Sequence, residues 1–200
     1  MTKINRRHFL GAVVAGSTGL IAPRAFATVR TGPPPALLAQ AKAALDRHGS
    51  SVQHRDVMGL VDFSLNSGQP RFHLVDIAGG RVAQTWLVAH GRGSDPGNSG
   101  WVQHFSNRPG SNASSEGSFL MDQTYYGKHG RSRRLKGLEP QNSLAMQRAI
   151  VVHGAAYVSS GAALSRGRVG RSLGCFAVAQ NTIDEVLTRL GPGRLLFAAK

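Results

Sequence analysis

The sequence of 200 residues contains a single cysteine and only ten acidic residues. One cysteine excludes a disulfide within the chain, and it also excludes the cysteine-rich sites that bind structural zinc. The HExxH pattern of zinc peptidases, the phosphate-binding Walker sequence and the glycine fingerprint of dinucleotide-binding domains are all absent. These absences remove several common enzyme classes and leave the lone thiol, Cys175, as a feature that needs an explanation.

The few acidic residues are outnumbered by 24 lysines and arginines, so the formal net charge is +14 at pH 7. A chain this basic is attracted to polyanions such as cell-wall polymers, lipid headgroups and nucleic acid. Aromatic residues make up only 6% of the chain, and no stacking platform or nucleic-acid-binding motif is present, which argues against nucleic acid as a partner. The charge alone is equally compatible with a solvated basic surface.

Residues 1–27 have the layout of an export signal. Two adjacent arginines, Arg6 and Arg7, precede an apolar stretch of small residues that ends with the small-x-small pattern AFA. The paired arginines indicate the twin-arginine type of signal. The alternative, a membrane anchor, is less favoured because the apolar stretch is short and rich in Gly, Ser and Thr.

We therefore predict cleavage after residue 27, export to the periplasm or cell envelope, and no stable membrane insertion afterwards. Four of the 24 basic residues and none of the acidic ones fall within 1–27, so residues 28–200 carry a net charge of +10. Outside the cytoplasm a basic protein meets cell-wall polymers and lipid headgroups more often than nucleic acid.

The remaining chain is predicted to form one domain. Residues 28–35 include three consecutive prolines and are predicted to be a linker, and residues 36–200 are enough for a single domain with its own core. The composition of 36–47, followed closely by Gly49, predicts a helix. Asn181 is expected to cap a second helix that runs to about residue 190.

Outside these two helices, much of the domain has a pattern typical of strands. Alternating apolar residues and short apolar runs predict strands at 57–65, 71–78, 81–90, 118–126, 148–155 and 193–199, with a glycine turn at 79–80. Polar, glycine-rich or basic segments are predicted to be loops at 91–117, 127–137 and 159–174. The first loop is long enough to indicate a function. The predicted fold is mainly β, a sandwich-like or barrel-like domain with a short N-terminal helix and a C-terminal helix.

The stretch GRVGRSLGCFAV, residues 167–178, sets Cys175 among glycines and basic residues. The thiolate is the nucleophilic form of cysteine, and the nearby Arg168 and Arg171 would favour it. Gly174 permits a sharp turn and lets backbone amides approach a carbonyl oxygen, as an oxyanion hole requires. Ser172 is expected to orient the substrate or the cleft, although an ordinary turn residue would look the same.

His153 is the best candidate for the base that would activate this thiol. It ends a short apolar run, is followed by Gly154, and lies 22 residues before Cys175, so a strand and its return could bring the two together. A Cys–His pair is the minimal unit for acyl transfer. The opposing interpretation is that Cys175 is a small buried residue beside Phe176 and that His153 is a structural histidine.

A second arrangement of catalytic residue types competes with this pair. His90 also ends a predicted strand and is followed by Ser94 and Asp95, which would allow a Ser/His/Asp hydrolase, but Ser94 lacks the glycines of a nucleophile elbow. The other histidines show no metal-ligand spacing and are expected to be surface or structural residues: His48, His54, His73, His104 and His129.

Several separated stretches resemble one known family. IVVHGAAYVSS at 150–160 and GRVGRSLGC at 167–175 are similar to the His-Gly and Ser-x-Gly-Cys motifs of the L,D-transpeptidase (YkuD-type) catalytic domain. Upstream stretches such as YYGKHGRSRRLKGLE resemble the murein L,D-transpeptidase branch in the same order. The commoner motif has histidine where this chain has Leu173, and arginine or asparagine shortly after the cysteine, where this chain has Phe176-Ala177.

The resemblance implies a cysteine acyltransferase that acts on peptidoglycan stem peptides through a thioester and releases D-Ala. It implies Cys175 as the nucleophile, His153 as the general base and the Gly154 carbonyl as the group that orients the histidine ring. Gly174 is the candidate backbone contributor to the oxyanion hole. The candidate substrate-binding residues are Ser172, Arg171 and Tyr157.

Three alternatives stay open on the acceptor and on catalysis itself. An amine of a neighbouring stem would resolve the thioester as a cross-link, whereas water would make the protein an L,D-carboxypeptidase. A protein of the same fold that binds peptidoglycan without catalysis is the third. The resemblance implies no metal and no organic cofactor for any of them.

Overall fold

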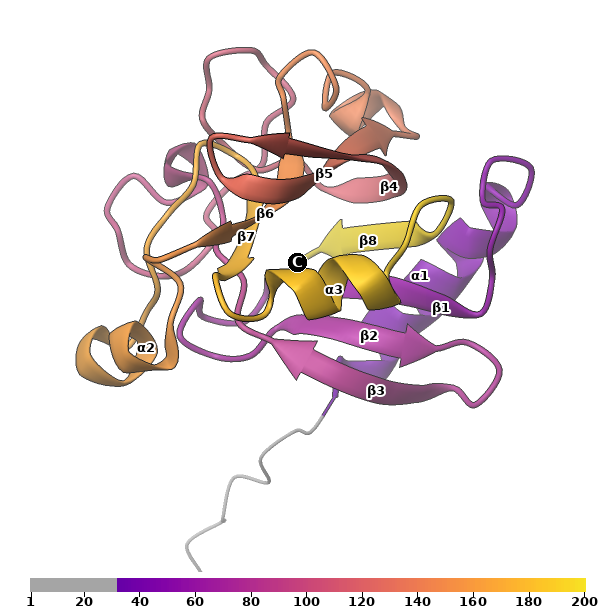
Figure 1. The fold of residues 1–200 in the computed structure, drawn as a ribbon, viewed down its shortest axis with the longest axis horizontal. Coiled ribbons are helices and arrows are strands. Elements are labelled where there is room, and N and C mark those ends of the chain that lie inside the picture. Colours follow the sequence, from indigo (N-terminus) through magenta and orange to yellow (C-terminus); the bar gives the residue numbers. More distant parts are fainter. Residues whose placement is uncertain (1–31) are drawn as a thin grey trace, which may run out of the picture. The chain divides into compact units, whose positions relative to one another are not determined.

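A computed structural model describes residues 32–200, so the predicted export signal at 1–27 and half of the predicted linker at 28–35 lie outside the described residues. The described part is built on one eight-stranded sheet with the order β3-β2-β1-β8-β4-β5-β6-β7 (Figure 1). The strands are β1 (Val57–Asp62), β2 (Phe72–Asp76), β3 (Arg81–Trp86), β4 (Gly117–Gly127), β5 (Gly130–Gly137), β6 (Val151–Ala155), β7 (Phe176–Ala179) and β8 (Leu195–Ala199). The helices are α1 (Pro35–Arg47), α2 (Ser160–Arg166) and α3 (Ile183–Arg189), with short 3-10 turns η1 (Arg92–Ser94) and η2 (Pro140–Asn142).

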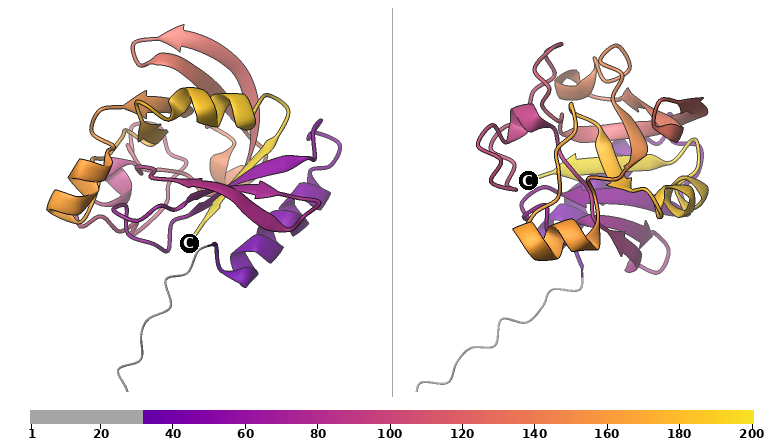
Figure 2. Two further views of the ribbon diagram at one scale, coloured as in Figure 1. Left: turned by 60° about the horizontal axis from the view of Figure 1, so that its bottom comes forward. Right: turned by 60° about the vertical axis from the view of Figure 1, so that its left-hand side comes forward.

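The helix predicted at 36–47 is confirmed as α1, which has a proline in its first turn, where the missing backbone donor costs nothing. Its buried positions, Leu37, Ala41, Ala44 and Leu45, recur at helical spacing and pack against apolar residues of β1 and β8. The helix α3 packs against β5 and β6 instead. Figure 2 (left) shows the two helices on opposite sides of the sheet.

The two edges of the sheet approach one another beyond the end of β3. Val88 forms an antiparallel bridge with Val178 of β7, and the Ala89 N–H donates to the Ala177 carbonyl at 2.8 Å. Large apolar side chains fill the space that the curved sheet encloses, and Phe176 packs on Phe63 and Phe119 with ring centroids 5.9 and 5.4 Å apart. The mainly β prediction is therefore confirmed, and the near-closure explains the barrel-like appearance.

Two predicted loops contain regular structure. Within 127–137, β5 pairs with both β4 and β6, although its sequence GRSRRLKG is basic. Arg133 of this strand is buried, and its Nη2 donates to the Leu187 carbonyl of α3 at 3.0 Å, whereas its Nε and Nη1 have no hydrogen-bond partner among the described residues. Within 159–174, α2 begins where the Ser159 hydroxyl accepts the Ala162 N–H at 3.1 Å and ends at Gly167, whose φ is +65°.

The end of the chain needs two smaller corrections. The strand β7 was not predicted, because four residues between a loop and a helix give little periodicity. The second helix exists, but it begins after Thr182, and the predicted Asn181 cap is not formed. Predicted strands at the other six positions correspond to β1, β2, β3, β4, β6 and β8.

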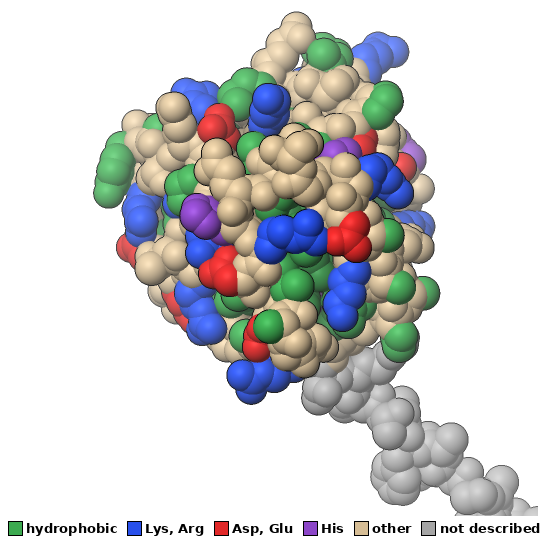
Figure 3. All heavy atoms as spheres, turned by 90° about the vertical axis from the view of Figure 1, so that its right-hand side faces the viewer, with side chains coloured by type: hydrophobic (Ala, Val, Ile, Leu, Met, Phe, Trp, Pro, Cys, Tyr) green, Lys and Arg blue, Asp and Glu red, His purple; other side chains and the backbone are tan. Residues whose placement is uncertain are grey.

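Basic side chains are spread over the surface of the domain. On the face that Figure 3 shows, lysines and arginines lie among uncharged and acidic side chains and form no continuous basic patch. Several basic side chains of the domain are paired, as Arg194 is with Asp56 at 2.8 Å and Arg131 with Asp184 at 3.0 Å. The positive charge on this face is therefore a distributed one.

Candidate active site

Cys175 lies immediately before β7, at the edge of a cleft. The parallel register of β6 and β7 pairs Val152 with Phe176 and His153 with Ala177, so Cys175 lies beside Val151. Side chains two residues apart on a strand project from the same face. Cys175 and His153 therefore project from the same face of neighbouring strands, and the 22 residues between them include the return through α2.

His153 is held as a neutral imidazole by its surroundings. Its side chain is buried, and Nδ1 donates to the Gly154 carbonyl at 2.9 Å, which leaves Nε2 as the unprotonated nitrogen. Burial lowers the pKa of His153, the Gly154 hydrogen bond opposes this, and nearby His129 and Lys128 lower the pKa further. The predicted orienting role of the Gly154 carbonyl matches this contact.

A cleft of about 410 Å³ contains both Cys175 and His153. It also contains the other predicted side chains of the site, and it is lined by Tyr125, Lys128, His129, Arg148, Ala149, Val151, His153, Tyr157, Arg171, Ser172, Leu173 and Cys175. None of these described lining residues is acidic. The structure therefore brings together five side chains that the sequence analysis selected, in a positively charged hollow.

The thiol of Cys175 is partly exposed and makes one hydrogen bond, from Sγ to the Ala149 carbonyl at 3.5 Å. Burial raises the pKa of Cys175, whereas the Val151 backbone and the positive charges of Arg148 and Lys128 lower it, and the net shift is upward. The thiol is therefore protonated at neutral pH in this conformation. Nucleophilic attack from this state requires a base to take the thiol proton.

Ser172 and Gly174 shape the turn that presents Cys175. The Ser172 hydroxyl is buried, donates to the Cys175 carbonyl at 2.7 Å and accepts the Gly174 N–H at 3.2 Å. Gly174 has a φ of +116°, and a Cβ there would lie 2.7 Å from the Ala113 carbonyl oxygen. Ser172 thus stabilises the turn that precedes Cys175, and its role towards a substrate stays a prediction. The oxyanion role of Gly174 stays a prediction, because its N–H would first have to leave Ser172.

The long segment 91–117 is hydrogen-bonded to this turn. Ser114 Oγ donates to the Gly174 carbonyl at 3.2 Å and accepts the Gly91 N–H at 3.0 Å. The Arg92 N–H donates to the Ser172 carbonyl at 2.8 Å. The segment that was predicted to be functional from its length therefore supports the backbone on both sides of Leu173, which is itself 55% exposed at the cleft.

The arrangement of His90, Ser94 and Asp95 is not a hydrolase site. His90 is fully buried, its Nδ1 accepts from Arg71 at 2.7 Å, and its Nε2 donates to Asp95 at 3.3 Å, so both ring nitrogens are occupied. Ser94 Oγ accepts the Ser114 N–H at 3.0 Å. Burial and the Arg71 charge lower the pKa of His90 to about 4. These residues hold the 91–117 segment in place.

Arg171 and Tyr157 both line the cleft. The Arg171 guanidinium donates to the carbonyls of Asp95 and Pro96, so it also anchors the 91–117 segment. The Tyr157 ring packs so closely on Gly170 that a Cβ at position 170 would lie 2.7 Å from the Tyr157 Cβ. Burial, followed by the charge of Cys175, raises the pKa of Tyr157 to about 12.

Three cleft residues were missed by sequence reasoning as parts of the site. Lys128 and His129 form the turn between β4 and β5, and Arg148 precedes β6. His129 is exposed, as predicted for a surface residue, but its ring also stacks on His153 with centroids 4.2 Å apart. No local pattern distinguishes these residues, because only the folded sheet brings them to the cysteine.

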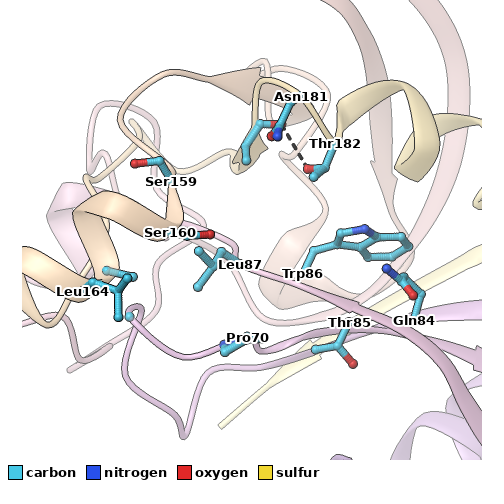
Figure 4. A pocket seen from close by; sticks show the side chains of 13 residues that line it. Pro70, Gln84, Thr85, Trp86, Leu87, Ser159, Ser160, Leu164, Asn181 and Thr182 are labelled. Carbon is cyan, nitrogen blue, oxygen red and sulfur yellow. Dashed lines mark hydrogen bonds between the residues drawn. The ribbon is translucent and has the colours of Figure 1, made fainter.

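A second, larger cavity lies away from the thiol. It has a volume of about 540 Å³ and lies between the end of β3 and α2 (Figure 4). Gln84, Ser160 and Asn181 line it, and none of its described lining residues is charged. Since it has no nucleophile paired with a base, it is not the candidate active site.

Residues 32–200 show neither a cluster of metal ligands nor a helix that could span a membrane. Within that range, no three His, Cys, Asp or Glu side chains gather where they could hold a metal ion. In the same part of the chain, no helix has the length and apolar character that crossing a membrane requires.

Comparison with known proteins gives a family. No curated protein sequence matches this chain significantly. Among solved structures, an L,D-transpeptidase from Mycobacterium smegmatis shares 13% identity at a TM-score of 0.44, and the match covers 72% of this chain and 59% of that one. An L,D-transpeptidase from Xylanimonas cellulosilytica shares 16% identity at a TM-score of 0.43, with 84% and 70% covered. The sequence model of the L,D-transpeptidase catalytic domain matches residues 33–199, and the chain therefore belongs to that family.

Proposed function

We propose that the protein is an exported cysteine acyltransferase that acts on peptidoglycan stem peptides, with residues 36–200 as its catalytic domain. The observation that carries this proposal is that the only cysteine and a buried, neutral histidine line one cleft. Family membership supports the transpeptidase class. The signal-like segment 1–27 supports export to the periplasm or cell envelope.

In the first half-reaction, His153 Nε2 takes the thiol proton of Cys175 as Sγ attacks the carbonyl carbon that precedes the terminal D-Ala. The attack forms a C–S bond and a tetrahedral oxyanion, which backbone N–H groups of the Gly174-Cys175 turn would stabilise. The C–N bond then breaks, and His153 returns the proton to the leaving D-Ala amine. The product is a thioester between Cys175 and the shortened stem.

In the second half-reaction, an acceptor attacks the thioester carbonyl and gives a proton to His153. The C–S bond breaks, and the sulfur recovers its proton from the histidine. An amine of a neighbouring stem gives a cross-link, whereas water gives a carboxypeptidase product. The ratio of these two products follows from whether the amine or water reaches the thioester first.

The charge of the cleft supports an anionic peptide as the substrate. Lys128, Arg148 and Arg171 line it together with two histidines, and none of the described lining residues is acidic. A stem peptide carries free carboxylates next to the bond that is cleaved, so a hollow of this sign favours its approach. Tyr157, on the cleft wall, offers an apolar ring for the peptide backbone.

The proposal is tested by incubating the purified protein with muropeptides that carry tetrapeptide stems. Mass spectrometry should detect free D-Ala and a Cys175 adduct of the tripeptide stem. Cys175→Ala, which removes the sulfur, should give neither product. If wild-type protein with an intact thiol also gives neither, catalysis is refuted. Equal binding of both proteins to sacculi would then favour the non-catalytic wall-binding alternative.

A further inference from the structure

The hairpin of β4 and β5 carries a histidine onto the face of the proposed base. Gly127 pairs with Gly130 across the turn, so Lys128 and His129 are its two loop residues, and Gly130 has a φ of +74°. The rings of His129 and His153 are stacked, with centroids 4.2 Å apart and an interplanar angle of 21°. Figure 2 (left) shows this hairpin arching beyond the rest of the sheet.

We propose that His129 is a positioning residue for His153. Its ring holds the His153 imidazole in one orientation and keeps water from one of its faces, so that the base stays neutral. This inference rests on the role proposed above for His153. It gives His129, at the tip of the β4–β5 hairpin, a role in a reaction scheme that so far has not included it.

Two restraints together fix the His153 ring. The hydrogen bond from Nδ1 to the Gly154 carbonyl, at 2.9 Å, holds one edge, and the stacked His129 ring holds the plane. The turn that carries His129 leads directly into β5, and β5 pairs with β6 through Ser132 and His153. With the edge and the plane both held, Nε2 keeps a constant direction, which proton transfer to or from sulfur requires.

The His153 side chain is 2% exposed although it lies next to an open cleft. His129 is itself exposed, so its ring forms the outer cover on the stacked face. Removing this cover would admit water and weaken the burial that lowers the pKa of His153. Removing the charge that a protonated His129 carries would act in the same direction.

The groups that face His153 determine how its titration should respond. The β4–β5 turn contributes Lys128 and His129, and both lower the pKa of His153. The other titratable or charged groups of the cleft are Tyr125, Arg148, Tyr157, Arg171 and Cys175. None of these five is altered by a substitution at position 129, so a change in the His153 titration reports on the stacked ring.

The test compares His129→Ala with His129→Phe, which keeps a ring in the stack without the titrating nitrogens. His54→Ala serves as the control, because His54 is an exposed histidine outside the cleft. The His153 pKa is read by NMR titration of its ring proton, assigned with His153→Gln. The rate of D-Ala release is measured across the same pH range.

For His129→Ala, we expect the His153 pKa and the acidic limb of the rate profile to rise together by about half a pH unit, which is about a threefold loss of rate on that limb. His129→Phe should restore most of the wild-type values, and His54→Ala should match wild type. An unchanged His153 pKa in His129→Ala overturns the proposal, as does a Phe variant that behaves like Ala. If no variant releases D-Ala, the proposed function fails, and the NMR titration still decides the role of His129.

Discussion

Replacing Arg148 by methionine is expected to weaken the attachment of the 91–117 segment and to raise the pKa of Cys175. The Arg148 guanidinium donates to the Ser106 carbonyl at 2.6 Å, to Ser115 Oγ at 2.7 Å and to the Ala113 carbonyl. The Ala113 carbonyl in turn abuts Gly174. The positive charge of Arg148 is also one of the influences that lower the pKa of Cys175. Methionine replaces the aliphatic part of the arginine side chain but supplies neither donors nor charge.

The expected loss of stability follows from these three strong hydrogen bonds. A hydrogen bond to a charged group contributes about 1.5–3 kcal/mol, but contributions within one network do not add, and water reaches part of the freed segment. We therefore expect the free energy of unfolding, measured by urea denaturation, to fall by about 3 kcal/mol. The pH midpoint of Cys175 alkylation by iodoacetamide should rise, because the thiolate loses a nearby cation.

Arg148→Lys separates the two effects. Lysine keeps the positive charge but cannot reproduce the planar fork that reaches several acceptors at once. Arg148→Lys should therefore lower the free energy of unfolding substantially but leave the pH midpoint of Cys175 alkylation close to the wild-type value. A methionine variant with the wild-type midpoint would refute the electrostatic reasoning. A lysine variant as stable as wild type would show that the hydrogen-bond fork does not hold the segment.

Three further predictions concern the backbone and the buried network. Gly174→Ala should cost about 2–4 kcal/mol in urea denaturation, because it combines a φ of +116° with a Cβ that would lie 2.7 Å from a backbone oxygen, whereas Gly97→Ala, with open space around it, should stay within about 0.5 kcal/mol. Ser172→Ala should cost about 2 kcal/mol by the same assay, because it leaves a buried N–H and a carbonyl without their partner. His90 has a pKa of about 4 when folded and about 6.5 when unfolded, so the unfolded chain binds the proton first. Wild-type stability should be complete above about pH 6.5 and fall by up to about 3 kcal/mol towards pH 4, and His90→Asn should flatten that slope.

Cys175 and His153 could be selected as candidates from the sequence because their signals are local. A lone thiol beside glycines and a histidine at the end of an apolar run can be recognised without a fold. The helix α1 was predictable for the same reason, since its buried residues recur at helical spacing. The mainly β class follows from six runs of strand-like residues, each bounded by turn residues.

The features that were missed depend on partners far away in the sequence. The basic strand β5 pairs with β4 and β6, and its buried Arg133 donates to a carbonyl of α3, 54 residues later. The His90 arrangement looked like part of a hydrolase because its true partner, Arg71, precedes it by 19 residues. The helix α2 has no fully buried residue, so only its Ser159 cap and its Gly167 end could have indicated it. In each case tertiary contacts outweighed the local pattern.

The raised pKa of Cys175 and the neutral state of His153 fit together as a resting site. Alkylation and oxidation both proceed through the thiolate, so burial that keeps the thiol protonated also protects it. Such protection matters for a lone cysteine if the protein is exported to an oxidising compartment. In the proposed reaction, the unprotonated Nε2 of His153 would take the proton once the thiol turns from Ala149 towards a bound carbonyl. Arg148 and Lys128 lower the pKa of Cys175 without ionising the resting thiol, so under this proposal the site would gain reactivity chiefly when a substrate is present.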